Sequence, residues 1–146
     1  MTAPQTTPIK LHLHTVIEQM QQREEHAFDE TGQITQVGNS LYLRYVETSE
    51  GQGLPVMIKI ASDGTLQLSR GNSKTDTQFK LYFNSNTPTL ANYRTPYGKI
   101  PLKVVTNHLV IQVKQQPLAG EINLMYQLFD EKQHIGNYRL RLLFSV

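Results

Sequence analysis

Residues 92–106 read NYRTPYGKIPLKVVT, which is a turn followed by a run in which every second residue is apolar. Within Thr95-Pro96-Tyr97-Gly98, proline suits the second position of a turn because its ring fixes φ at about −65°. Glycine at the fourth position lets the chain enter the next strand. The stretch therefore predicts a hairpin corner between two antiparallel strands, with Tyr97 packed over the turn. A loop that contacts a ligand is the alternative.

Pro101 adds to this prediction, because proline has no backbone N–H to donate to a neighbouring strand. The strand at residues 99–106 is therefore expected to begin at the edge of a sheet or at a bulge. Its partner is a shorter strand at residues 90–93.

The alternation of apolar and polar residues recurs along the whole chain. Nine runs show it, and they cover residues 9–17, 41–45, 56–60, 66–68, 79–83, 100–104, 109–113, 122–128 and 138–146. With the short strand at residues 90–93, about ten strands are expected. Turn residues separate the runs, and the pair Asp63-Gly64 favours a tight hairpin between two of them. Short strands at about ten-residue spacing are typical of an antiparallel sandwich or barrel. We expect an all-β fold, a single antiparallel closed β-barrel of about 8–10 strands.

Residues 16–25, VIEQMQQREE, depart from this pattern. They are rich in helix formers but lack a clear N-cap and a sustained apolar face. We interpret them as the end of the first strand and a loop, with at most one helical turn. No repeat, low-complexity tract or linker divides the chain. We therefore expect a flexible N-terminal lead-in at residues 1–7 and one barrel domain at residues 8–146.

The composition narrows the class of protein. A chain of 146 residues can bury about 70% of the surface that its unfolded form exposes, so it needs no disulfide or metal for stability. It has no cysteine, which excludes thiol catalysis and thiolate metal sites and suits a reducing compartment. No apolar run approaches the length of a membrane helix, and the N-terminus has no secretory signal. We expect a cytoplasmic protein with no membrane partner.

Arg70 carries the most specific information about a site. It follows Leu66 and Leu68 at the same parity, so its guanidinium is expected to point into the barrel near a strand end. A buried cation must be paired or heavily hydrogen-bonded, because its desolvation otherwise costs several kcal/mol. Two interpretations stay open. Arg70 closes a barrel mouth by donating to backbone carbonyls and stacking on a tyrosine, or it binds the carboxylate or phosphate of a ligand.

Other polar side chains share this inward parity, namely Tyr45, Tyr126, Tyr138 and Thr106. They can line the same cavity as Arg70 or fill it. With Tyr93 added, the predicted ligand-binding residues are Arg70, Tyr45, Tyr93, Tyr126, Tyr138 and Thr106.

We expect no catalytic residue and no cofactor. Ser69 lies in Leu-Ser-Arg-Gly, which is not a nucleophile elbow, and no glycine-rich phosphate loop precedes a helix. The acidic residues are expected in solvated loops, and none is placed on the apolar face. His12, His14 and Glu18 have the spacing of metal ligands on a strand, but the residues that support such a motif in cupin barrels are absent. Two histidines on a solvated strand face is the favoured interpretation, so no metal is expected.

The charges are unevenly distributed, although the net charge is only +2. Basic and aromatic residues occupy outward positions on the predicted strands, namely Lys10, Arg44, Lys59, Lys80, Lys103, Lys114, Arg139, Arg141, Tyr42 and Tyr82. Single-stranded nucleic acid binds such surfaces through phosphate neutralisation and base stacking. The same pattern arises without any partner, because Asp favours turns and Lys protects sheet edges.

Several segments resemble one known family. Leu68-Ser69-Arg70-Gly71, Phe79, residues 93–98 (YRTPYG), residues 102–106 and residues 120–126 (GEINLMY) are similar to the YwiB-like bacterial proteins. The resemblance runs from about Ile9 to the end of the sequence. It implies a calycin-like, lipocalin-shaped barrel and brings no established activity, substrate or catalytic residue. The chain also has no tryptophan, so the glycine–tryptophan signature of true lipocalins is absent.

The sequence therefore predicts a non-catalytic β-barrel that binds a small ligand, for which an anion is one candidate, or a protein partner. The alternative is a protein that binds single-stranded nucleic acid, such as RNA, through the outer face of the barrel. The sequence does not determine the oligomeric state.

Overall fold

The computed structural model describes residues 5–47, 53–72, 74–75, 77–131 and 133–146, and their regular structure consists of β-strands. The strands are β1 (Gln5–Gln19), β2 (Gln22–Val37), β3 (Ser40–Glu47), β4 (Leu54–Ile60), β5 (Leu66–Arg70), β6 (Phe79–Phe83), β7 (Thr89–Thr95), β8 (Gly98–Gln115), β9 (Leu118–Asp130) and β10 (Gln133–Ser145). Their order across one sheet is β6-β5-β4-β3-β2-β1-β10-β9-β8-β7, and the neighbours pair antiparallel. The predicted all-β antiparallel fold is confirmed.

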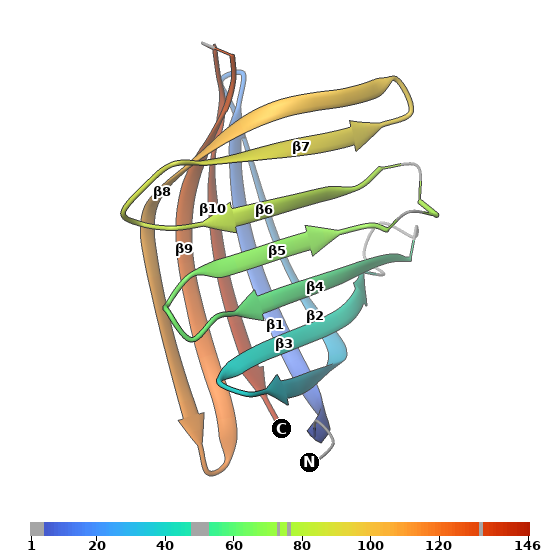
Figure 1. The fold of residues 1–146 in the computed structure, drawn as a ribbon, viewed down its shortest axis with the longest axis vertical. Coiled ribbons are helices and arrows are strands. Elements are labelled where there is room, and N and C mark those ends of the chain that lie inside the picture. Colours follow the sequence, from blue (N-terminus) through green and yellow to red (C-terminus); the bar gives the residue numbers. More distant parts are fainter. Residues whose placement is uncertain (1–4, 48–52, 73, 76, 132) are drawn as a thin grey trace.

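The strands form a nearly closed barrel of two crossed layers (Figure 1). The long strands β1, β2, β9, β10 and most of β8 run along the long axis, and the shorter strands β3 to β7 cross them. The two edge strands meet at Gln78 and Arg94, whose backbone groups exchange hydrogen bonds of 3.0 and 2.8 Å. The hydroxyl of Thr89 in β7 also donates to the carbonyl of Tyr82 in β6. These contacts bring the edges of the sheet together.

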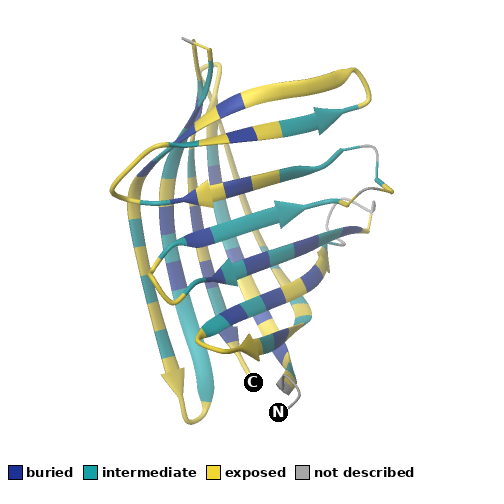
Figure 2. Ribbon diagram, viewed as in Figure 1, coloured by how far each residue is buried: buried dark blue, intermediate teal, exposed yellow. Residues whose placement is uncertain are grey.

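The apolar side chains point into the barrel because successive residues of a strand face opposite sides. In β4, Leu54, Val56, Ile58 and Ile60 are buried, and the residues between them are half-buried. Figure 2 shows a similar alternation along other strands. The core therefore occupies the space between the two layers. The most completely buried side chains are Leu43, Phe83, Val104, Ile122 and Leu142.

The interpretation of residues 16–25 as a strand end and a loop is right for residues 16–19, which end β1, and wrong for residues 22–25, which begin β2. β1 continues to Gln19, Met20 and Gln21 form a tight turn with φ of 51° and 64°, and β2 begins at Gln22. Residues 22–31 show no apolar alternation because they pair with β1 alone, and most of their side chains are exposed. A strand that buries neither face has no need of alternating apolar residues.

β8 is one strand where the sequence indicated two, at residues 99–106 and 109–113. Its pairing with β9 shifts register between Thr106 and His108. Before the shift the even-numbered residues Leu102 and Val104 are buried, whereas after it the less exposed positions have odd numbers. An extra residue at a β-bulge reverses the parity of a strand without ending it. This reversal explains why the alternation seemed to stop and restart.

The hairpin corner at Thr95-Pro96-Tyr97-Gly98 is confirmed, since Thr95 pairs with Gly98 and joins β7 to β8. Pro101 lies in the part of β8 that pairs only with β7 among the described strands, because pairing with β9 begins at Lys103. This is the predicted edge position. The expectation that Tyr97 packs over the turn is wrong, because this residue is 99% exposed at the tip of the hairpin.

The N-terminal lead-in predicted at residues 1–7 overlaps β1. The strand starts at Gln5, which pairs with Gln36 of β2, and residues 1–4 lie outside the described part of the chain. A single sheet links all ten described strands. The part of the chain that the structure describes contains no helix long and apolar enough to cross a membrane.

Gly32 marks the place where the two layers separate. β2 pairs with β1 from Gln22 to Gln36, but β3 pairs with β2 only between Gly32 and Val37. A Cβ atom on Gly32 would lie 2.4 Å from the backbone oxygen of Arg44 and 3.0 Å from Cβ of Tyr45. The absence of a side chain thus allows β3 to turn sharply away, and it leaves residues 22–31 of β2 as a free edge beside the barrel interior.

Candidate functional site

An interior cavity of about 620 Å³ lies beside residues 24–28 of β2. These residues belong to the stretch 22–31, which does not pair with β3. One wall comes from β1, β2, β9 and β10, and the other comes from β3, β4, β5 and the first residue of β6. The cavity is thus the space between the crossed layers that the core side chains leave open.

Stacked aromatic side chains form one wall of the cavity. The rings of Tyr126 in β9 and Tyr138 in β10 stack with centroids 5.0 Å apart, and Phe83 of β6 lies 4.7 Å from Tyr126. The side-chain amide of Gln19 donates a hydrogen bond to the hydroxyl of Tyr138. Burial raises the pKa of the Tyr126 phenol, and the neighbouring Tyr138 raises it further. Burial likewise raises the pKa of Tyr138, so both phenols stay protonated at neutral pH.

A charged pair stands on the opposite side of the cavity. Nε of Arg70 lies 2.8 Å from Oε2 of Glu47, and their side chains are 29% and 14% exposed. Tyr45 is close to this pair: burial raises the pKa of its phenol, Glu47 raises it further, Arg70 lowers it and Glu30 raises it. One carboxylate and one guanidinium therefore stand at this wall of the cavity, and the positive charge of Arg70 is balanced by Glu47.

Glu47 shows that one sequence-based expectation is wrong. We placed no acidic residue on the apolar face, yet Glu47 lines the cavity. The sequence could have predicted this position, because Glu47 follows Leu43 and Tyr45 at two-residue spacing and therefore faces the same side of β3. Arg70 needed a partner inside the barrel, and the acidic residue at the end of β3 supplies it.

Four of the six predicted site residues line the cavity, namely Arg70, Tyr45, Tyr126 and Tyr138. The other two lie behind its walls. Tyr93 packs against Phe79, with ring centroids 5.7 Å apart, and Phe79 itself lines the cavity. Thr106 is buried opposite Tyr126 in the register of β8 and β9, outside the cavity lining. The alternation along each strand thus identified which side chains point into the barrel, but not which of them border the cavity.

Sequence reasoning missed Phe79 as a cavity residue, although its inward parity was visible. It also missed Phe28, Glu24 and Glu25, because the strand that carries them was not predicted. These residues reach the cavity from the free edge of β2. No local pattern could have placed them there.

The histidines considered as metal ligands are engaged in cross-strand pairs with β2. Nδ1 of His12 lies 2.7 Å from Oδ1 of Asp29, and Nε2 of His14 lies 2.7 Å from Oε1 of Glu25. Each imidazole therefore has its own carboxylate partner on the neighbouring strand. In the described residues, no three His, Asp or Glu side chains are grouped so that they could hold a metal ion.

Comparison with known proteins places this barrel in a family. Residues 11–142 match the family described as a domain of unknown function, DUF1934. The chain belongs to this family. The chain is similar to the uncharacterized β-barrel protein YwiB of Bacillus subtilis (strain 168). The two sequences are 27% identical over 135 residues, which cover 91% of each chain.

A solved structure supports the fold of this DUF1934 member. The crystal structure of the ywiB protein from Bacillus subtilis superimposes with a TM-score of 0.80 at 23% identity, covering 98% of this chain and 94% of the other. The barrel architecture and the resemblance to YwiB-like proteins are therefore confirmed. The family description assigns no function, so any activity must be argued from the cavity and the surface of this chain.

Proposed function

We propose that this DUF1934 barrel binds a small ligand in its interior cavity and does not act as an enzyme. One observation carries the proposal: a cavity of about 620 Å³ reaches both the Arg70–Glu47 pair and the stacked Tyr126 and Tyr138 rings. Ligand pockets typically measure about 300–1,000 Å³ and combine apolar walls with a few polar groups. The cavity has this combination, since Leu13, Ile58 and Leu68 also line it, at least one of them from each layer.

The aromatic wall and the charged pair on the opposite side of the cavity indicate which kind of ligand would fit. Aromatic rings on one side suit a flat apolar body, because rings pack well in stacked or tilted arrangements. The polar part of the ligand would meet Arg70 as a donor and Glu47 as an acceptor. A simple anion, one of the predicted candidates, would approach Arg70 against the repulsion of Glu47. A neutral or zwitterionic head that both donates and accepts hydrogen bonds satisfies the pair better.

Binding is favoured over catalysis by the state of the polar groups. The raised pKa values of Tyr45 and Tyr126 keep these phenols protonated, so they supply hydrogen bonds and not a base. Glu47 is already engaged by Arg70, whose Nε lies 2.8 Å from its Oε2, so this carboxylate serves the ion pair. We also propose a calycin-like barrel in the cytoplasm, supported by the antiparallel barrel and by the absence of cysteine.

The proposal is tested with Nile red, a neutral aromatic dye, and with a matched pair of variants. Leu68→Phe enlarges a side chain in the cavity wall, whereas Leu90→Phe makes the same change at a position that is 81% exposed. We expect saturable dye fluorescence with the wild-type protein, at least about tenfold weaker binding by the Leu68→Phe variant, and wild-type binding by the Leu90→Phe variant.

Native mass spectrometry of the purified protein gives an independent measurement. A co-purifying small molecule that is present in the wild type and depleted in the Leu68→Phe variant supports the proposal. Equal dye binding by both Leu→Phe variants, together with no bound small molecule, rejects it.

A further inference from the structure

The strand register brings outward side chains of distant segments into a continuous row. From β3 to β6, Tyr42 pairs with Lys59, Lys59 with Gln67, and Gln67 with Tyr82. The row resumes on β7, where Leu90 pairs with Lys103 of β8, and Lys103 pairs with Phe129 of β9. If the register of the Gln78–Arg94 bridge is extended by four residues, Tyr82 lies beside Leu90. We call these seven residues the outer band: Tyr42, Lys59, Gln67, Tyr82, Leu90, Lys103 and Phe129.

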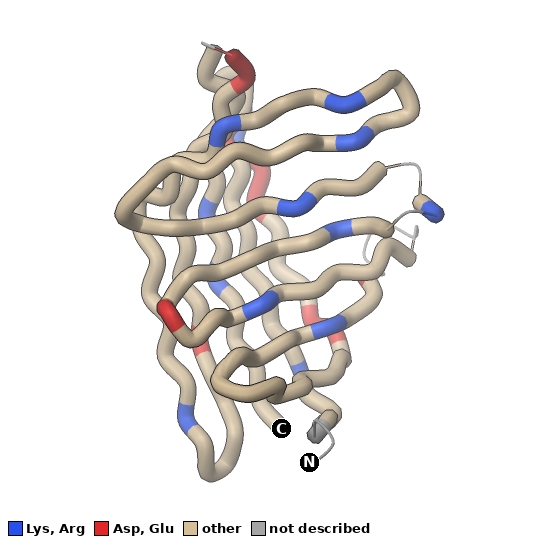
Figure 3. Tube along the Cα trace, in the orientation of Figure 1, with Lys and Arg blue, Asp and Glu red and all other residues tan. Residues whose placement is uncertain are grey.

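A second row runs parallel to the outer band. Its members are Arg44, Met57, Ser69 and Lys80 on β3 to β6, followed by Asn92 and Pro101 on β7 and β8. Neither row contains an acidic residue, and together they carry the cations Arg44, Lys59, Lys80 and Lys103. Figure 3 shows basic residues on several of the crossing strands, with an acidic residue at the turn between β4 and β5.

Aromatic side chains of the outer band contact basic side chains of both rows. Arg44 and Lys59 both lie over the ring of Tyr42, at 5.3 and 5.5 Å from its centroid. Lys103 lies 6.0 Å from the ring of Phe129. Neighbouring strands are about 4.8 Å apart, so Tyr82 stands about 14 Å from Tyr42 and about 14 Å from Phe129. Aromatic rings thus recur along the band at a regular spacing, with cations between them.

Protection of sheet edges does not explain these cations. Lysine is frequent on edge strands because it prevents pairing with other chains. Arg44 and Lys59, however, lie on β3 and β4, which have a hydrogen-bonded neighbour on both sides at these positions. Edge protection therefore does not account for Arg44 in the second row or for Lys59 in the outer band.

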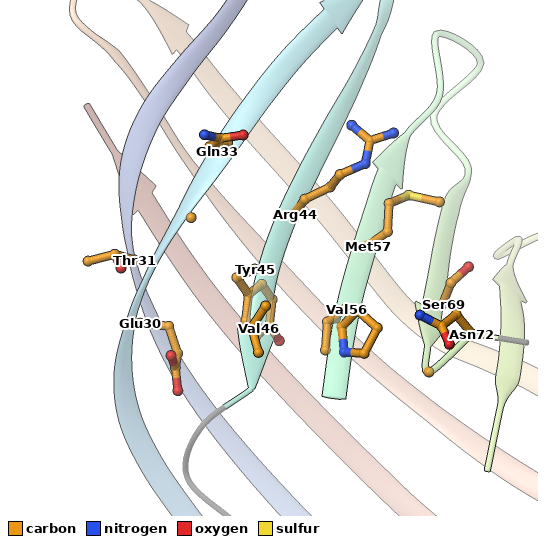
Figure 4. A pocket seen from close by; sticks show the side chains of 13 residues that line it. Glu30, Thr31, Gln33, Arg44, Tyr45, Val46, Val56, Met57, Ser69 and Asn72 are labelled. Atoms are coloured by element: carbon orange, nitrogen blue, oxygen red, sulfur yellow. The ribbon is translucent and has the colours of Figure 1, made fainter. Parts of the chain in front are cut away.

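A groove adjoins one end of the second row. It has a volume of about 600 Å³, and Gln33, Arg44, Met57, Ser69 and Asn72 are among the side chains that line it (Figure 4). The carboxylate of Glu30 also lines the groove and would repel a phosphate, so the groove is poorly suited to bind one. Its amide and hydroxyl groups are suited to hydrogen bonds with bases or riboses.

From these observations we propose that the outer band, together with the cations of the second row, binds single-stranded nucleic acid, separately from the ligand cavity. The cations neutralise phosphates, and Tyr82, the exposed ring between the half-buried Tyr42 and Phe129, stacks on a base. Sequence-tolerant binders of single strands use this combination. The band follows the curved outer surface of the barrel across seven strands, and a flexible single strand can follow this curve. A planar membrane surface would touch only a part of it.

The first test measures the contribution of the cations with fluorescein-labelled 20-nucleotide poly(U) RNA by fluorescence anisotropy. The triple variant Arg44→Gln, Lys59→Gln and Lys80→Gln is compared with Lys10→Gln, Lys74→Gln and Lys114→Gln, which removes the same charge outside both rows. We expect at least about tenfold weaker binding by the first variant and a salt dependence whose slope is smaller by about 2, with at most about twofold weaker binding by the second. Equal losses in the two variants overturn the proposal, since they indicate a response to net charge alone.

The second test concerns base stacking. Tyr82 is 44% exposed, and the chain has no tryptophan, so Tyr82→Trp introduces a unique fluorophore in the band. We expect poly(U) to quench this tryptophan and heparin, which has charges but no bases, to leave it largely unquenched. Equal quenching by both polyanions overturns the proposal, as does tighter binding to vesicles that contain phosphatidylserine than to the RNA.

Discussion

At the scale of single residues, the ion pair between Arg70 and Glu47 has the greatest consequence. The two side chains come from strands β5 and β3, which are separated by β4 in the sheet. Each inward charge would be costly to bury alone, because desolvation of an unpaired ion disfavours folding. Together they place one donor and one acceptor at the cavity wall. Parity predicted the inward position of Arg70, and the same rule applied to β3 would have predicted Glu47.

A double-mutant cycle measures the coupling between these two residues. We expect Glu47→Gln and Arg70→Gln each to lower the free energy of unfolding by about 1–2 kcal/mol, and the double variant to lose less than the sum. The outward pair Glu121 and Arg141, 2.9 Å apart with Arg141 56% exposed, is the control, and Glu121→Gln is expected to cost less than either inward substitution because water screens the pair. Urea denaturation of the wild type, the two single variants, the double variant and the control variant gives the free energies. Additive losses at Glu47 and Arg70 would show that the pair does not stabilise the fold.

At the scale of elements, the strand boundaries that escaped prediction are those that tertiary contacts determine. Residues 22–31 of β2 have no second neighbour strand and few buried side chains, so their composition resembles that of a loop. The register shift near residue 107 reverses the parity of β8, so one strand has the pattern of two. By contrast, β4 and its hairpin to β5 were predicted well. There, one face is buried throughout, and Asp63 accepts hydrogen bonds from the backbone N–H and the hydroxyl of Thr65 at the turn.

Gly32 gives a prediction at the scale of elements. Gly32→Ala places a Cβ atom against the backbone oxygen of Arg44, which is not free to move as a flexible side chain would be. We expect the substitution to lower the free energy of unfolding by about 1–3 kcal/mol. Thermal denaturation measures the loss, and Gln33→Ala at the exposed neighbouring position is the control. If the variant is as stable as the wild type, β3 can leave β2 without a glycine at this point.

At the scale of the whole molecule, the aromatic stack joins walls that the sheet does not connect directly. Phe83 lies in β6 at one edge of the sheet, whereas Tyr126 and Tyr138 lie in β9 and β10. The contact between Phe83 and Tyr126 therefore depends on closure of the barrel. Because the stack borders the cavity, closure also forms the proposed ligand site.

The stability of the closed barrel is expected to fall at alkaline pH. Folding raises the pKa of Tyr126 above 10.0, so the folded protein keeps a proton that the unfolded chain releases. This contribution to stability is complete below pH 10 and is lost as the pH rises towards the pKa of the folded state. We expect Tyr126→Phe to flatten this decline and Tyr97→Phe, at a 99% exposed position, to leave it unchanged. Urea denaturation between about pH 8 and 11 measures the difference, and parallel curves for the two variants would contradict it.

The sequence by itself determined the strand periodicity, the antiparallel barrel and the inward direction of Arg70, Tyr45, Tyr126 and Tyr138. These properties follow from residue order, because each side chain on a strand faces opposite to the one before it. Only the tertiary structure decided which inward side chains border an open cavity, that Glu47 pairs with Arg70, and that distant segments align into the outer band. These properties depend on how the sheet curls and where its layers separate, and such long-range geometry leaves no local pattern in the chain.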